Sequence, residues 1–249
     1  MKFTAIIPAR YASSRFPGKP LARLGRKTVI ERVYTQARKA IDDVVVATDD
    51  DRIMQAVNAF GGRCVMTLPE LPSGTDRVCA AYTACSCDAD VVINIQGDEP
   101  FIDPEQIKAL AGCFDDPQTQ IATLVRKFGR DADYSTVANP NTPKVVVDSR
   151  GFALYFSRSV IPYQRGIDTE LWPQAYDYLA HVGIYAYRAE VLKEITRLPQ
   201  SPLEQAEKLE QLRWLQAGYR IKTALTTLST IGIDTPDDLR RAEQYLAQL

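Results

Sequence analysis

Four short apolar runs, each ending in polar residues, constrain the fold of this chain more than any other feature. These runs are residues 3–7, 44–48, 64–67 and 91–95. The runs at 3–7, 44–48 and 91–95 lack the alternation of a half-exposed strand, as expected for strands buried on both faces of a sheet, and 64–67 is a further predicted strand. Between them, residues 28–40 and 52–60 place apolar side chains on one helical face. Alternating strands and helices predict an α/β fold with a mostly parallel central sheet.

The pattern changes in the second half of the chain. Two apolar runs, residues 144–147 and 152–156, flank the sequence Asp-Ser-Arg-Gly and predict a β-hairpin. Residues 163–178 are polar and aromatic without a clear period, so we expect a loop there. The sequence contains no internal repeat and no linker segment. We therefore predict one domain over residues 1–249, in which approximately residues 144–185 form an inserted hairpin subdomain.

Charge and composition exclude several classes of protein. The chain has 30 basic and 31 acidic side chains, which argues against a general nucleic-acid or membrane-surface binder. No apolar run approaches the roughly 20 residues of a membrane-spanning helix, and the N-terminus lacks a signal-peptide pattern. We therefore expect a cytoplasmic protein. Its five cysteines lack zinc-ribbon spacing, so we predict reduced, mostly packed thiols, with Cys85 and Cys87 the one close pair.

A basic loop follows the first predicted strand. It carries Arg10, Arg15 and Lys19 with no acid among them, and three prolines stiffen it. It is not a Walker P-loop, because Gly18 and Lys19 are followed by Pro20 instead of Ser or Thr. Open α/β sheets bind ligands beyond the C-terminal ends of their strands, so these cations predict a polyphosphate site. The alternative is a solvated basic loop.

Two acidic residues have positions that suit a metal ligand. Asp98 follows the predicted central strand at residues 91–95, and Asp234 lies just ahead of the helix cap Thr235. Mg²⁺ prefers one or two carboxylates together with phosphate oxygens and water. Beside the basic loop, these acids predict a site for Mg²⁺ and a nucleoside triphosphate. Each acid could instead be an ordinary turn residue.

Two further segments begin helices. Ser73 is a predicted N-cap, and the exposed N–H groups behind it favour an anion or an acceptor atom. Arg77 in the first turn opposes the helix dipole, which suggests that it serves a ligand, although the segment could be a cap and nothing more. Ser201 opens a capping box, and we expect one helix over residues 201–217.

At these motifs the sequence resembles the 3-deoxy-manno-octulosonate cytidylyltransferases, the CMP-Kdo synthetases. The matching blocks follow the same order along essentially the whole chain. They are residues 7–11, 15–21, 73–77, 94–100, 154–158, 181–185, 209–213 and 234–236. The resemblance implies a Rossmann-like nucleotidyltransferase fold, a homodimer, and a Mg²⁺-dependent reaction of CTP with Kdo that gives CMP-Kdo and pyrophosphate for lipopolysaccharide synthesis.

The same resemblance implies roles for individual residues. The implied CTP-binding residues are Ala9, Arg10, Arg15, Lys19, Met66, Ser73, Gly74, Arg77 and Gln96. The implied sugar-binding residues are Arg158, His181, Tyr185, Glu210 and Gln211. The implied Mg²⁺ ligands are Asp98 and Asp234, and the implied catalytic residues are Arg15, Lys19 and Asp98. One departure is Leu71, where the family often has His, so any contact of that His is missing here.

Three other functions compete with this one. The chain could activate a different acidic sugar, such as 8-amino-Kdo or sialic acid, or it could act on a neutral sugar phosphate. It could also be a catalytically silent nucleotide-binding module. A silent module is expected to lack an acid such as Asp98 or the cation Lys19, and both residues are present.

Overall fold

The computed structural model describes residues 1–13, 15–228 and 231–248, so Ser14 of the basic loop lies outside the described residues. The chain divides into two compact units. Unit 1 holds residues 1–108, residues 186–196 and the C-terminal segment, and unit 2 holds residues 109–185 and 197–228. In the described part of the chain, no helix is long and apolar enough to cross a membrane.

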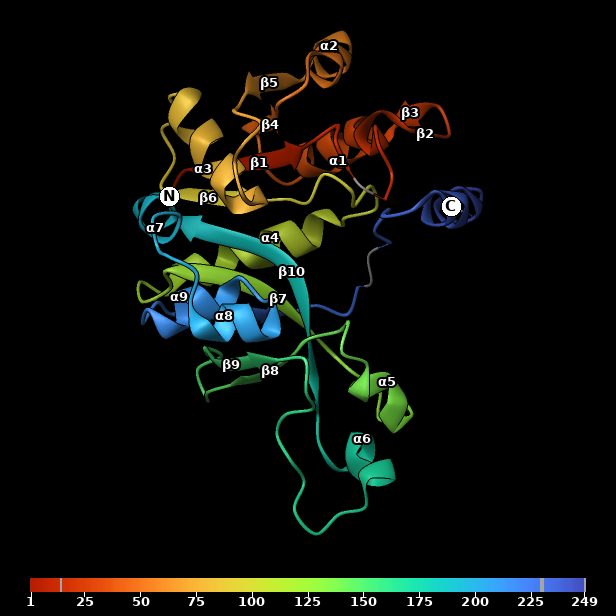
Figure 1. Ribbon diagram of the computed structural model, residues 1–249, viewed down its shortest axis with the longest axis vertical. Helices are drawn as coiled ribbons and strands as arrows, with labels where there is room; N and C mark the ends of the chain where they lie inside the picture. Colours follow the sequence, from red (N-terminus) through yellow and green to blue (C-terminus); the bar gives the residue numbers. More distant parts are fainter. Residues whose placement is uncertain (14, 229–230, 249) are drawn as a thin grey trace. The chain divides into compact units, whose positions relative to one another are not determined.

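Unit 1 is built on parallel strands in the order β6, β1, β4, β5 (Figure 1). Their bounds are Val91–Asn94 for β6, Phe3–Ala9 for β1, Val44–Thr48 for β4 and Arg63–Met66 for β5. All residues of β4 and β6 are buried. The four apolar runs are therefore strands, and the predicted fold class, α/β with a mostly parallel sheet, is confirmed.

The helices of unit 1 begin at polar caps. Thr28, Asp50 and Ser73 each accept a backbone N–H bond at the start of a helix, as N-cap residues do. These helices are α1 (Val29–Arg38), α2 (Asp51–Ala59) and α3 (Gly74–Ala84). The other elements are η1 (Lys19–Leu21), β2 (Arg23–Leu24), β3 (Lys27–Thr28), α4 (Pro104–Gly112, which continues into unit 2), α7 (Ala189–Ile195) and α10 (Pro236–Leu246).

Unit 2 contains the predicted hairpin. Its strands β8 (Lys144–Val147) and β9 (Ala153–Ser157) are antiparallel, and β8 also pairs with β10 (Leu179–Arg188), whose last residues belong to unit 1. A parallel pair is formed by β7 (Ile121–Lys127) and β11 (Ile221–Leu225). The shorter elements are η2 (Cys113–Asp115), α5 (Tyr134–Ala138), η3 (Thr169–Leu171) and α6 (Trp172–Ala175).

The expectation of a single helix over residues 201–217 is wrong. The chain forms α8 (Pro202–Glu207) and α9 (Gln211–Gln216), and Lys208 between them is left-handed with φ of 53°. The break coincides with bonds made by Glu207, whose carboxylate accepts from the Ser157 hydroxyl at 2.6 Å and from the Arg158 N–H at 2.8 Å. These contacts to β9 compete with helix continuation, which the helical pattern of the sequence does not reveal.

The segment 163–178 is only partly a loop, because it contains η3 and α6. Trp172 at the start of α6 is 4% exposed and packs in a cluster with Val137 and Tyr178. Its indole N–H donates to the carbonyl oxygen of Ile167 at 2.9 Å. Burial of one large aromatic side chain therefore orders a stretch that has no sequence period.

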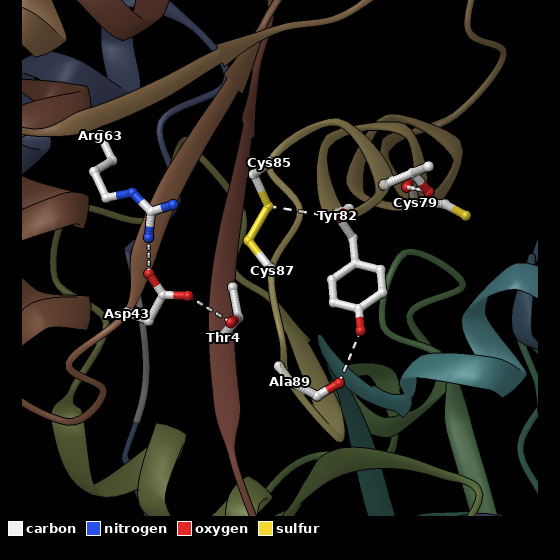
Figure 2. Close-up of a disulfide and its surroundings, with 9 residues drawn as sticks. Thr4, Asp43, Arg63, Cys79, Tyr82, Cys85, Cys87 and Ala89 are labelled. Atoms are coloured by element: carbon white, nitrogen blue, oxygen red, sulfur yellow. Dashed lines mark hydrogen bonds and ion pairs between the residues drawn. A yellow bond between two sulfur atoms is a disulfide. The ribbon is translucent and has the colours of Figure 1, made fainter.

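The cysteines differ from expectation at one pair. Cys85 and Cys87 form a disulfide at the end of α3, beside Tyr82, whose hydroxyl donates to the carbonyl oxygen of Ala89 (Figure 2). Ser86 between them is left-handed with φ of 49°, and this turn leaves the two Cα atoms 5.2 Å apart. The prediction of reduced thiols is thus wrong for this pair. It holds for Cys64, Cys79 and Cys113, which are free.

Candidate functional site

A cavity of about 380 Å³ opens in unit 1 beside the ends of β1 and β6, within the size range of small-molecule sites. Residues from the basic loop, the start of α3, the turn after β6 and the segment before α10 line it. The lining residues that the sequence had predicted are Ala9, Arg10, Arg15, Lys19, Gly74, Arg77, Gln96, Asp98 and Asp234. Met66 and Ser73 do not line it: Met66 is exposed at the end of β5, and Ser73 caps α3.

Lys19 joins the two acids. Its ammonium lies 2.7 Å from the Asp98 carboxylate and 3.2 Å from the Asp234 carboxylate, with only 12% of its side chain exposed. Arg15 approaches the second oxygen of Asp234 at 3.1 Å. Carboxylates from distant parts of the sequence therefore converge on one cation. Asp98 therefore makes a specific ion pair in addition to its place in the turn after β6.

Backbone bonds fix the positions of both acids. The N–H of Ile233 donates to the carbonyl oxygen of Asp98 at 2.8 Å, so the segment before Asp234 is tied to the turn after β6. The N–H of Asp234 donates to Asp238, which also forms a capping box with Thr235 at the start of α10. These bonds, led by the one from the Thr235 hydroxyl, lower the pKa of Asp238 to about 2.

Gly97 allows β1 and the turn after β6 to approach closely. A Cβ atom at this position would lie 2.6 Å from the carbonyl oxygen of Pro8, a backbone atom that cannot swing aside. Only glycine permits this contact without moving the end of β1. The contact keeps Asp98 next to the start of the basic loop.

Arg77 is completely buried at the start of α3, and its guanidinium bonds to Asp49 at 2.9 Å and to the Thr67 hydroxyl. Burial lowers its pKa, and the ion pair with Asp49 opposes this shift. Among the described residues its Nε–H has no hydrogen-bond partner, and the atom is buried. Sequence reasoning missed Asp49 and Thr67, although both directly follow strands that end at this edge of the sheet.

The two carboxylates of Asp98 and Asp234 suit a cation of higher charge than the Lys19 ammonium. Asp98 and Asp234 already share the ammonium of Lys19, so their oxygens face a common positive centre. No group of three His, Cys, Asp or Glu side chains that could hold a metal occurs among the described residues. Two carboxylates fit Mg²⁺ when phosphate oxygens and water complete its shell. The protein alone offers an incomplete site.

The five predicted sugar residues lie in unit 2, where an aromatic cluster surrounds His181. Its ring centroid lies 5.1 Å from that of Phe156 and 5.4 Å from that of Tyr185, and its Nε2 is 3.0 Å from the hydroxyl of Thr123. Tyr185 in turn contacts Trp214 edge to face. Burial lowers the pKa of His181 to about 4, so the imidazole is neutral near pH 7. It can hydrogen-bond a ligand but adds no charge.

Arg158 is anchored by backbone oxygens. Its guanidinium donates to the carbonyls of Glu207 at 2.6 Å, Pro140 at 2.8 Å and Lys208 at 3.3 Å. Gln211 is 4% exposed, and its amide nitrogen has no hydrogen-bond partner among the described residues. Glu210, at the N-cap position of α9, lies 3.8 Å from Arg213.

The depressed pKa of His181 predicts a loss of stability in acid. Below the unfolded value of 6.5, the unfolded chain binds a proton that the folded chain refuses until about pH 4. The free energy of unfolding is therefore unaffected by His181 above pH 6.5, and it decreases as the pH falls from 6.5 to about 4. Between pH 7.5 and pH 5 we expect His181 to cost the folded state about 2 kcal/mol.

Urea unfolding of the wild type and of His181→Phe at both pH values measures this term. His181 is the only histidine, and the carboxylates contribute equally to both proteins. The variant is expected to lose about 2 kcal/mol less than the wild type on acidification. An equal loss in the two proteins would show that His181 is protonated normally in the folded state.

Comparison with known proteins gives consistent similarities. A family profile described as cytidylyltransferase matches residues 4–222. A relative from Bacteroides thetaiotaomicron, named 3-deoxy-manno-octulosonate cytidylyltransferase, is 60% identical over 99% of this chain and 98% of its own length. A relative of the same name from Myxococcus xanthus is 46% identical over 97% of this chain and 95% of its own length.

Solved structures show the same similarity in three dimensions. The structure of a CMP:2-keto-3-deoxy-manno-octonic acid synthetase complexed with CTP matches with a TM-score of 0.91 and 45% identity, covering 100% of this chain and 99% of that one. A structure from Bacillus anthracis named as a putative glucose-1-phosphate thymidylyltransferase matches with a TM-score of 0.67 at 17% identity, covering 99% of this chain and 96% of that one. At that identity the likeness concerns the fold alone.

Proposed function

Because this chain belongs to the cytidylyltransferase family, and within it to the 3-deoxy-manno-octulosonate cytidylyltransferases, we propose that it transfers CMP from CTP to Kdo. The oxygen of the anomeric hydroxyl forms a bond to the α-phosphorus, and the bond from that phosphorus to the bridging oxygen breaks. Pyrophosphate leaves with the electron pair, the hydroxyl proton is released, and CMP-Kdo remains. The observation that carries the proposal is the meeting of Lys19, Asp98 and Asp234 in one cavity.

The basic loop neutralises the triphosphate. Arg10, Arg15 and Lys19 line the cavity and present the cations that phosphate oxygens need. Charge on the leaving pyrophosphate grows during the reaction, so positioned cations stabilise the transition state more than the bound substrate. We assign this task to Arg15 and Lys19. Each forms an ion pair with one of the two proposed metal ligands, Arg15 with Asp234 and Lys19 with Asp98, so both lie beside the proposed metal site.

Asp98 and Asp234 would hold Mg²⁺ together with phosphate oxygens. When bound, the ion withdraws charge from the phosphate and orients it. The two carboxylates face Lys19 in the cavity, and they would be the residues that hold the ion while the Lys19 ammonium serves the phosphate. Removal of Mg²⁺ with a chelator is accordingly expected to stop turnover.

A second set of lining residues is assigned to the base. Ala9, Gly74, Arg77 and Gln96 are the assigned cytosine and ribose contacts in the cavity. Arg77 is held rigidly by Asp49 and retains a buried Nε–H donor without a partner among the described residues. Cytosine offers acceptor atoms at its ring carbonyl and ring nitrogen, and the side-chain amide of Gln96, which lines the cavity, is a donor that can pair with them.

Arg158 is the assigned partner of the sugar carboxylate. A guanidinium has five N–H donors, of which three bond to carbonyl oxygens here. Each terminal nitrogen therefore keeps one N–H donor, and these two charged donors are available to a carboxylate. Tyr185, Glu210 and Gln211, with neutral His181, are assigned to the sugar hydroxyls.

Arg158→Lys is expected to raise the KM for Kdo about 10- to 100-fold, because a lysine cannot replace a bidentate bond to a charged group. The KM for CTP is expected to change less than about twofold, since the triphosphate uses other cations. Steady-state kinetics with each substrate varied in turn measures both values. Arg130→Lys is a matched control, because its guanidinium also donates to a backbone carbonyl oxygen in unit 2, that of Gln174 at 2.7 Å, and pairs with Asp177, which has no assigned sugar role. A change confined to the KM for CTP would contradict the assignment.

We further propose a cytoplasmic homodimer that serves lipopolysaccharide synthesis. Large apolar side chains stand exposed in unit 2, among them Leu154 at 60%, Tyr163 at 74% and Leu171 at 47%. Where such side chains form one contiguous patch, they mark a contact with another protein surface. Light scattering on the purified protein tests the dimer, and Tyr163→Lys should shift it toward monomer.

A substrate panel tests the reaction itself. Wild-type protein is incubated with CTP, Mg²⁺ and either Kdo, 8-amino-Kdo, sialic acid or a sugar 1-phosphate, and pyrophosphate is measured. We expect release with Kdo and a product that carries one phosphodiester phosphorus by ³¹P NMR. Release only with another sugar would overturn the choice of Kdo, and CTP binding without release from any sugar would indicate a silent module.

A further inference from the structure

Outside the lining of the cavity, Arg52 makes a contact with the basic loop that no substrate role explains. Its guanidinium carbon lies 3.3 Å from the ring centroid of Tyr11, so the two planar groups are stacked. Arg52 is in the first turn of α2, where a cation opposes the helix dipole. An unfavourable placement combined with a specific contact suggests a role beyond helix formation.

Asp50 holds Arg52 in place. Both oxygens of its carboxylate accept from the guanidinium, at 2.9 and 2.7 Å, and the same side chain caps α2. This bond lowers the pKa of Asp50 and raises the pKa of Arg52. A bidentate pair fixes the plane of the guanidinium as well as its position. The guanidinium that stacks on Tyr11 is therefore fixed to the backbone between the end of β4 and the start of α2.

Tyr11 in turn holds the two ends of the basic loop together. Its carbonyl oxygen accepts from the N–H of Gly18 at 2.9 Å and from the N–H of Ser13 at 3.0 Å. Gly18 lies against the hydroxyl end of the ring, because a Cβ there would come within 3.1 Å of Cε2 and Cζ of Tyr11. Its φ of 72° turns the chain into Lys19, the first residue of η1. Arg15 lies inside the loop that these contacts close.

We propose that Arg52, clamped by Asp50, is a positioning residue that fixes Tyr11 and thereby holds the loop bearing Arg15 and Lys19 in its triphosphate-binding arrangement. The inference rests on the proposed function for the identity of the ligand. It does not depend on that function for the contact itself. Arg52 is absent from the cavity lining and acts through Tyr11 alone. Stacking preorders a loop that otherwise loses conformational freedom when it binds CTP.

The first test measures CTP binding. Arg52→Ala is expected to weaken the Kd and KM for CTP about 5- to 10-fold while leaving the KM for Kdo within about twofold. Arg63→Ala is the matched control, since Arg63 is equally exposed (55% against 57%) and is also paired with an aspartate, Asp43. An unchanged affinity in Arg52→Ala, or an equal loss in Arg63→Ala, overturns the proposal.

The second test uses the ring. Tyr11→Leu is expected to match Arg52→Ala, and the double variant should be no weaker than the worse single variant, because both remove one contact. Tyr11→Phe keeps the ring and should recover most of the affinity that Tyr11→Leu loses. Losses that add fully in the double variant would show that the two side chains act separately. Thermal unfolding midpoints identify any variant whose loss reflects misfolding, and Arg52→Lys then replaces Arg52→Ala.

The third test needs no activity. Trypsin cleavage after Arg15 reports the mobility of the loop directly, and we expect Arg52→Ala to speed it at least about fivefold without CTP. If wild-type protein binds no CTP, the proposed function fails while this readout still decides the inference. An unchanged cleavage rate in Arg52→Ala would show that the stack does not order the loop.

Discussion

Asp98→Asn is expected to lower kcat by at least about 10²- to 10³-fold while the protein remains folded, because the change removes charge without changing shape. The Asp98 carboxylate lies 2.7 Å from Lys19 in the cavity and is 30% exposed, so an amide fits in the same space. The loss should appear in kcat more than in the KM for Kdo. Pyrophosphate release under saturating CTP and Kdo measures it.

Asp237→Asn is the control for this experiment. It is an acid in the first turn of α10, near Asp234 in sequence but 73% exposed and paired only with Arg240 among the described residues. Its kcat should stay within about twofold of wild type, as for an exposed surface pair. If Asp98→Asn turns over like the wild type, Asp98 is only a turn residue and the proposed metal site is lost.

Lys19→Met is expected to weaken CTP binding about 10- to 100-fold and to lower kcat further, because one charge-assisted bond to phosphate disappears. The substitution also leaves Asp98 and Asp234 facing each other without the ammonium that separates them. Added Mg²⁺ should therefore recover more stability in the variant than in the wild type. Calorimetric titration with CTP and thermal unfolding with and without Mg²⁺ measure the two effects.

The matched control is Lys108→Met. Lys108 lies on α4, is 54% exposed and pairs with Glu105 one turn away, so its removal should change CTP affinity by less than about twofold. Wild-type affinity in Lys19→Met would mean that Lys19 neutralises the two acids and does not bind the triphosphate.

The parts of the fold that follow from local pattern could be predicted from sequence. The strands β1, β4, β5 and β6 are continuous apolar runs, and the hairpin of β8 and β9 is marked by its turn residues. The break between α8 and α9 could not be predicted, because residues around Lys208 are helix formers and the competing bonds come from β9. Distant contacts override local preference there.

The candidate site likewise has residues that could be predicted from sequence and residues that could not. Charged residues at strand ends, such as Lys19 and Asp98, are predictable because parallel strands bring their C-terminal ends to one edge. The supports behind them are not, since the pairing of Asp49 with Arg77 and the stack of Arg52 on Tyr11 join segments that share no sequence signal. These supports depend on which strands are neighbours, which only the structure supplies.

Binding of Mn²⁺ as a paramagnetic substitute for Mg²⁺ tests the central claim most directly. Electron paramagnetic resonance measures protein-bound Mn²⁺ in the presence of CTP for the wild type and for Asp98→Asn with Asp234→Asn. We predict that bound Mn²⁺ rises with CTP in the wild type, and that the double variant retains CTP but loses at least about tenfold in Mn²⁺ affinity. Wild-type Mn²⁺ affinity in the double variant would contradict a metal–CTP site built from these two acids.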